Sequence, residues 1–186
     1  MYTIFAKEAI AVSTKTLTLV AVLTAVLCIC GPLAVPIGPV PISLTSGVLM
    51  LIALLLGAGR STLCCAVYLL LGLVGLPVFS SFRAGMSVLA GPTGGYLVGF
   101  LPMTALGGYF CARTDKRTLQ AAALVAATAL LYVLGTAWFV YQTGKTLPVA
   151  LGACVLPFLP GDALKILLVV TAGNLLKDRL KKANLL

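Results

Sequence analysis

The chain has 186 residues, of which 61% are hydrophobic and only 9% are charged, and its mean hydropathy is +1.14. This composition excludes an ordinary soluble domain and favours membrane helices, because unbroken apolar runs of ~20 residues contradict the alternating pattern of a membrane β-barrel. The thirteen Lys and Arg against four Asp and Glu lie mostly between these runs and near the two ends, as in an inner-membrane protein. The sequence therefore predicts an all-α membrane protein with no nucleic-acid partner.

Six apolar segments are predicted to cross the bilayer and to form a single transmembrane domain over residues 1–186. The leading residues 1–15 are too long and too mildly charged for a cleaved signal peptide, so we expect a cytoplasmic or interfacial lead into the first span. The proline-rich connection over residues 35–41 is too apolar for a solvated loop and is expected to fold back against the bundle. The spans are expected at about residues 16–30, 44–56, 61–76, 91–111, 119–141 and 157–176, with 57–60 and 142–153 among the connections.

The positive charges predict the orientation of these spans. With the N-terminus inside, ten of the thirteen Lys and Arg fall on the cytoplasmic side, and only Arg83 and Lys145 fall in outer loops. This bias predicts that both termini are cytoplasmic. The sixth span then enters from outside, so Asp162 and Lys165 are expected in its outer half, on the same side of the membrane as Arg83. A solute captured there comes from outside the cell.

Asp162 and Lys165 are the most informative residues, because ionisable side chains within a span are costly, rare and usually functional. They share one helix face at i, i+3. One interpretation is structural: Asp162 follows Pro160 and Gly161 at the start of its helix, where a carboxylate can cap backbone N–H groups, with Lys165 as its counter-ion. The other is that the pair offers an acceptor and a donor to a polar ligand headgroup such as an amide or a urea. The two interpretations are compatible.

Three further residues are candidates for a binding site near the outer face. Arg83 is either a solvated loop charge or a bidentate partner for a ligand carboxylate. Tyr96 and Phe79 are either membrane-interface anchors or walls of a pocket. Tyr96 follows two glycines, which allow a backbone or a ligand to come close.

The remaining motifs exclude some functions and suggest a contact surface. Ala21 and Ala25 have the spacing that permits close helix contact, although such spacings also arise by chance in Ala-rich spans. The six cysteines lie in or beside apolar runs and are interpreted as packing residues. The chain contains no His and no cluster of metal ligands or paired carboxylates, so we expect no metal, no cofactor and no enzymatic activity.

Four sequence blocks resemble those of a known family. They are Pro39-Val40-Pro41-Ile42-Ser43-Leu44, Gly75-Leu76-Pro77-Val78-Phe79, Gly91-Pro92-Thr93-Gly94-Gly95-Tyr96 and Pro160-Gly161-Asp162-Ala163-Leu164-Lys165. In this order they are similar to the BioY family, the biotin-specific substrate-binding (S) components of energy-coupling-factor (ECF) transporters. The resemblance covers nearly the whole chain.

The resemblance implies a six-helix S-component fold that binds biotin from outside, and partners consisting of a transmembrane coupling protein and two ATPases. It implies that Asp162 and Lys165 contact the biotin headgroup, that Arg83 is the local candidate for the biotin carboxylate, and that Ala21 and Ala25 dock on the coupling protein. The alternatives are an S component for a different vitamin and a non-transporting membrane scaffold.

Overall fold

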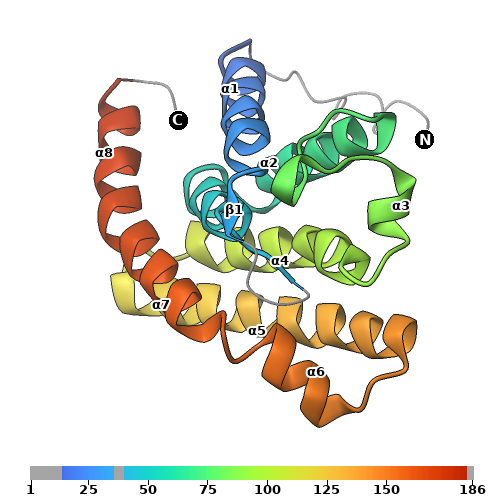
Figure 1. Cartoon of the computed structure of the whole chain (residues 1–186). Helices are drawn as coiled ribbons and strands as arrows, with labels where there is room; N and C mark the ends of the chain where they lie inside the picture. The colour runs from blue at the N-terminus through green and yellow to red at the C-terminus, as the bar shows by residue number, and fades with distance from the viewer. Residues whose placement is uncertain (1–13, 36–39, 184–186) are drawn as a thin grey trace, which may run out of the picture.

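The computed structural model describes residues 14–35 and 40–183 (Figure 1). The leading residues 1–13 and the middle of the proline-rich connection, residues 36–39, lie outside this part, so the expectations for them stay predictions. The elements in chain order are α1 (Thr14–Cys30), β1 (Ala34–Val35), β2 (Ile42–Ser43), α2 (Thr45–Val74), the 3₁₀ turn η1 (Ser80–Phe82), α3 (Met86–Leu89), α4 (Gly94–Ala112), α5 (Arg117–Thr143), α6 (Leu147–Cys154), α7 (Leu159–Leu168), the π-helical turn η2 (Val169–Gly173) and α8 (Asn174–Lys182).

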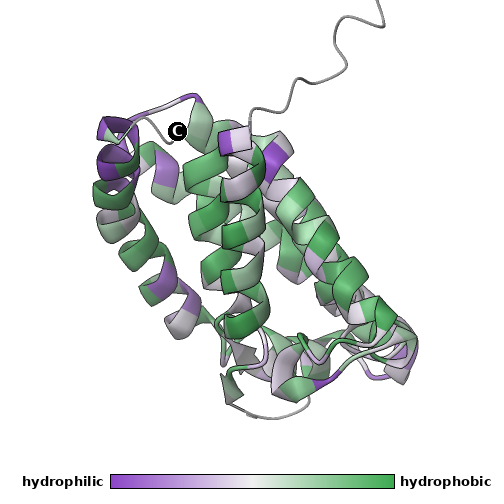
Figure 2. Cartoon of the chain, turned by 90° about the horizontal axis from the view of Figure 1, so that it is seen from above, coloured by the Kyte–Doolittle hydropathy of each residue, from purple (hydrophilic) through white to green (hydrophobic). Residues whose placement is uncertain are grey.

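The described chain is almost entirely helical, and much of it is apolar enough to lie in a bilayer. Four of its helices are long and apolar enough to cross a membrane: α2, α4, α5 and the continuous helix Leu159–Lys182 formed by α7, η2 and α8. The helix α1 is also apolar but shorter. Figure 2 shows hydrophobic residues along most of each helix and a gathering of hydrophilic residues in α8. The prediction of a helical, multi-pass membrane protein is therefore confirmed.

The second and third predicted spans form the two halves of α2. Gly57, at φ 72° and ψ −175°, interrupts the helix between them. Glycine adopts this left-handed backbone without a steric penalty, whereas a side chain at that φ is strained. The expected four-residue connection 57–60 was wrong in its length, because the helix resumes directly after Gly57.

Two other connections contain structure that the sequence interpretation missed. Residues 142–153 were expected to connect two spans, with no helix assigned to them, but most of them belong to the helix α6, which begins with Leu147 and Pro148. Proline at a helix start loses no hydrogen bond and favours helical φ, which explains why the helix begins there. The proline-rich connection is flanked by β1 and β2, which pair antiparallel, and the side chain of Val40 is buried as expected for a segment that folds back.

The centre of the molecule is built from α2, α4 and α5. The helices α4 and α5 lie side by side, and α6 folds back beside the end of α5 (Figure 1). Gly108 of α4 packs on the break in α2, where an added Cβ would come within 2.7 Å of the Ala58 nitrogen. The last helix packs on this core mainly through buried residues of α7 and η2, including Asp162 and Val170.

Candidate functional site

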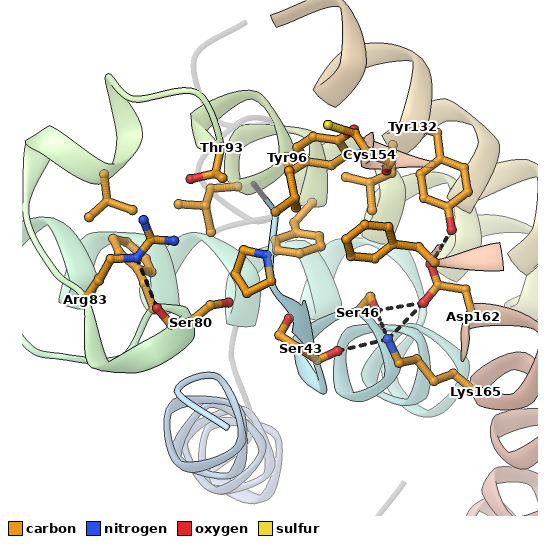
Figure 3. Close-up of a pocket in the computed structure, with 18 residues that line it drawn as sticks. Ser43, Ser46, Ser80, Arg83, Thr93, Tyr96, Tyr132, Cys154, Asp162 and Lys165 are labelled. Atoms are coloured by element: carbon orange, nitrogen blue, oxygen red, sulfur yellow. Dashed lines mark hydrogen bonds and ion pairs between the residues drawn. The ribbon is translucent and has the colours of Figure 1, made fainter. Parts of the chain in front are cut away.

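A cavity lies among α2, α4, α5, α7 and the segments around β2 and η1 (Figure 3). Its empty volume is about 640 Å³, with the open space at its mouth included. Asp162, Lys165, Arg83 and Tyr96 all line it, as does Phe79. The other lining residues are Val40, Pro41, Ser43, Ser46, Ser80, Val88, Thr93, Leu97, Phe100, Leu131, Tyr132, Cys154 and Phe158.

An ion pair occupies one end of this cavity. The Lys165 ammonium lies 2.9 Å from Asp162 Oδ1, and the Asp162 side chain is buried. Ionised groups are stable in such a setting only when they are paired and hydrogen-bonded. Both conditions are met here, because Ser46 Oγ also donates to Asp162 Oδ1 at 3.3 Å and Tyr132 donates to Oδ2 at 2.6 Å.

These contacts exclude the helix-capping role in the structural interpretation of Asp162. Its carboxylate oxygens contact side chains of α2 and α5 and Lys165 of its own helix, not the backbone N–H groups of α7. Asp162 is therefore not a capping residue, although its pairing with Lys165 is structural as well as chemical. The carboxylate is held by two other helices and faces the cavity (Figure 3).

The sequence interpretation missed Tyr132, Ser43 and Ser46. Ser43 supplies its backbone carbonyl to the Lys165 ammonium at 2.9 Å, and Ser46 Oγ accepts from the same ammonium at 3.0 Å. A signal for Tyr132 was present. It lies four residues from both Thr128 and Thr136 in the apolar fifth span, and hydroxyls at that spacing mark one helix face. In a membrane such a face turns toward the protein interior.

Arg83 lies at the opposite end of the cavity (Figure 3), on a strained turn. Ser81 and Phe82 are consecutive non-glycine residues with φ of 61° and 57°, a conformation that costs about 1–3 kcal/mol per residue. The turn is held by backbone bonds from Phe79 N to Arg83 O at 3.0 Å and from Ser81 N to Pro32 O at 3.0 Å. Phe82 points outward and is 67% exposed, while Arg83 Nε donates to the Ser80 carbonyl at 3.2 Å.

Tyr96 forms part of the apolar wall between these two polar ends. Its ring is buried against Gly135 of α5, where a Cβ would overlap the ring. Its hydroxyl bonds to Thr136 Oγ1 at 2.9 Å and donates to the Cys154 carbonyl at 3.4 Å. Tyr96 is therefore a wall residue, and the membrane-anchor alternative does not fit its burial.

The other two predicted site residues, Ala21 and Ala25, lie elsewhere. Both are exposed on α1, on a face that does not line the cavity. Within residues 14–35 and 40–183 no group of three or more His, Cys, Asp or Glu side chains is placed to hold a metal ion.

Comparison with known proteins identifies the family to which this chain belongs. The sequence profile of the BioY family matches residues 6–182. The chain is 35% identical over 169 residues to the biotin transporter BioY2 of Lactococcus lactis subsp. cremoris, covering 90% of this chain and 93% of the relative. It is 37% identical over 164 residues to the biotin transporter BioY of Thermotoga maritima, covering 87% and 92%. A crystal structure described as the S-component for biotin from an ECF-type ABC transporter superposes with a TM-score of 0.83 at 31% identity, covering 88% of this chain and 91% of that one.

Proposed function

The chain belongs to the BioY family, and on that basis we propose that it binds biotin and mediates its uptake across the cytoplasmic membrane as the S component of an ECF-type transporter. Its relatives are biotin transporters, and its structural neighbour is a biotin S-component. A transporter component of this kind is not an enzyme. The proposed mechanism is capture of the vitamin in the cavity, with the whole chain acting as one substrate-binding domain.

The arrangement of the cavity is the observation that best supports this ligand. Biotin carries a polar cyclic urea at one end, an apolar chain in the middle and a carboxylate at the other end. The cavity has Asp162 and Lys165 at one end, an apolar wall that includes Tyr96, and Arg83 at the other (Figure 3). We assign the urea to Asp162 and Lys165, and the carboxylate to the Arg83 guanidinium, whose planar donors suit a carboxylate.

Binding of labelled biotin to the detergent-purified protein tests this function. Saturable, tight binding is expected, and Asp162→Asn should weaken it by about 100-fold, because the change leaves the Lys165 charge without its counter-charge. Lys165→Ala should weaken it similarly. Asp115→Asn is the matched control, because the Asp115 carboxylate is 93% exposed and lies 3.8 Å from Lys177, away from the cavity.

Each result has a defined meaning. Absence of biotin binding by the natural sequence, together with tight binding of another vitamin, would reassign the ligand while keeping the S-component role. Absence of binding by any vitamin would leave a membrane scaffold in which Asp162 and Lys165 are only a structural pair. Undiminished binding by Asp162→Asn would remove that residue from the site.

The proposed topology has six spans and both termini in the cytoplasm. The Gly57 break, which divides α2 into two helical halves, supports counting it as two spans, and the charge bias supports the orientation. A fluorescent-protein fusion at the C-terminus is expected to fluoresce, and an epitope inserted at Gly144 is expected to bind antibody on protoplasts. An epitope reached only after permeabilisation would contradict this orientation.

The proposed partners are the transmembrane coupling protein and the ATPase subunits of an ECF transporter. The exposed positions of Ala21 and Ala25 on α1 support their assignment as the docking surface, because small side chains allow two helices to approach closely in a membrane.

A further inference from the structure

At the end of the cavity that holds Asp162 and Lys165, hydrogen-bond acceptors outnumber the available donors. The Lys165 ammonium has three protons, and its three bonds go to Ser43 O, Ser46 Oγ and Asp162 Oδ1. The Ser46 hydroxyl proton goes to Asp162 Oδ1 at 3.3 Å. The ionised carboxylate can only accept, so Tyr132 must be the donor in its 2.6 Å bond to Oδ2. Without a ligand, every donor proton of Lys165, Ser46 and Tyr132 therefore has an acceptor within this cluster.

Acceptor capacity is therefore left over in this cluster, and two neighbouring oxygen atoms, Asp162 Oδ2 and the Tyr132 hydroxyl oxygen, hold part of it. Asp162 Oδ1 already accepts from Lys165 and Ser46, whereas Oδ2 accepts only from Tyr132 among the residues that the structure describes. The Tyr132 hydroxyl proton is donated to Asp162, so its oxygen can act only as an acceptor toward a ligand. The carboxylate polarises this hydroxyl, which makes its oxygen a stronger acceptor than an isolated phenol.

We propose that Tyr132 determines specificity at the headgroup end: its hydroxyl oxygen and Asp162 Oδ2 together receive one N–H of the ligand. The two oxygens are 2.6 Å apart, close enough for one N–H to be shared between them in a three-centre bond. Both atoms belong to residues that line the cavity. A ligand atom that presents lone pairs instead of an N–H at this point meets two acceptors and is rejected.

This inference rests on the proposed function, because the biotin urea supplies the N–H. It assigns a role to a hydroxyl beyond that of holding Asp162 in place. A purely structural Tyr132 would affect all ligands of the same shape equally, whereas an accepting Tyr132 distinguishes N–H from oxygen at one ring position. Ligand selectivity therefore separates the two roles.

The test compares biotin with its two cyclic carbamate analogues, in each of which one urea N–H is replaced by an oxygen atom of similar size. In the natural sequence, one of these analogues is expected to bind at least tenfold more weakly than biotin. Tyr132→Phe keeps the ring and removes the second acceptor, so it should weaken biotin binding about tenfold and reduce the preference over that analogue by a similar factor. The affinity ratio is measured within one preparation, so a loss of folded protein cancels.

Tyr141→Phe is the control, because it removes a hydroxyl from the same helix at a position that is 80% exposed and outside the cavity. It should change neither the affinity nor the ratio. A Tyr132→Phe protein that binds biotin and both analogues more weakly by the same factor would overturn the inference and leave the proposed function intact. A natural sequence that binds none of the three ligands would instead overturn the proposed function.

Discussion

Asp162 and Lys165 show how a charged pair can be both buried and available to a ligand. Asp162 accepts hydrogen bonds from Ser46 and Tyr132, and Lys165 donates to the Ser43 carbonyl and to Ser46. These bonds offset the cost of removing the two charges from water. The pair is electrically neutral as a unit, and it is fixed before any ligand arrives. A preorganised site of this kind binds with less loss of conformational entropy than one that must be ordered on binding.

The proposed contact between Arg83 and the biotin carboxylate can be tested with a single substitution. If its guanidinium binds the biotin carboxylate, Arg83→Gln should weaken biotin binding by about 10- to 100-fold, as expected for a lost hydrogen bond between charged groups. The same change should leave binding of biotinamide, which has no carboxylate charge, within about twofold. Titration of both ligands against both proteins gives the coupling directly.

Lys145→Gln is the control for charge alone, since Lys145 is the other cation expected in an outer loop and does not line the cavity. Equal weakening of both ligands by Arg83→Gln would mean that the change disturbs the strained turn at Ser81 and Phe82, and that Arg83 does not bind the carboxylate.

At the level of helices, close packing between α4 and α5 sets the width of the cavity. The Tyr96 ring of α4 lies directly on Gly135 of α5, and Gly72 of α2 lies against the Phe79 ring in the same way. Both rings line the cavity. Glycine is required at these positions by the space available, since neither has a positive φ.

Gly135→Ala should therefore push the Tyr96 ring into the cavity. We expect a lower melting temperature, corresponding to about 1–3 kcal/mol of overpacking, together with weaker biotin binding. Thermal unfolding followed in detergent and a binding titration measure the two effects.

Gly152→Ala in α6 is the matched control, because a Cβ there meets nothing within 4 Å. It should leave binding unchanged and slightly raise the melting temperature, since alanine favours helix over glycine by about 1 kcal/mol. If Gly135→Ala behaves like Gly152→Ala, Tyr96 does not set the width of the cavity.

Helices could be predicted where the sequence contained a long apolar run or a clear break between two such runs. Long apolar runs located α4 and α5 closely, and the glycines after Leu56 marked the break in α2. The helix α6 was missed because it is short and lies between turn-forming residues. The π-helical turn η2, whose Val169 and Val170 are buried, was not predicted because no local sequence pattern marked it.

The charged residues of the site and part of its wall could be named from sequence. Asp162 and Lys165 stand out as ionisable side chains in an apolar segment, and Arg83 stands out as one of the few charges expected on the outer face. Tyr96 was a candidate because it follows two glycines. The hydroxyls of Tyr132 and Ser46 cost little in a span and acquire a role only when three helices meet. Their contacts join residues 30 and 116 positions apart in the chain, and no local pattern encodes such a distance.

For the molecule as a whole, the proposed binding site and the proposed docking surface are separate. The cavity is formed mainly by α2, α4, α5 and α7, whereas Ala21 and Ala25 are exposed on α1. We therefore expect changes to the α1 face to interrupt transport while leaving capture intact.

Ala21→Leu combined with Ala25→Leu is expected to preserve biotin affinity within about twofold and to reduce uptake in cells by about tenfold or more, because larger side chains prevent close helix contact. Labelled-biotin uptake and binding, measured on the same variant, test the separation.

Ala122→Leu combined with Ala126→Leu is the matched control, because these residues have the same spacing on an exposed face of α5. It should affect neither measurement. Equal loss of uptake in both double variants would contradict the assignment of Ala21 and Ala25 as the docking surface.

The bond between Lys165 and the Ser43 carbonyl also bears on how the protein is made. The ribosome completes residue 43 long before residue 165, so the earlier helices are synthesised before the last helix is available to pack against them. Asp162 leaves water at a lower cost when Ser46 and Tyr132 are already in place to hydrogen-bond with it. We therefore expect the last helix to insert most readily against assembled earlier helices, and this same step would complete the pocket.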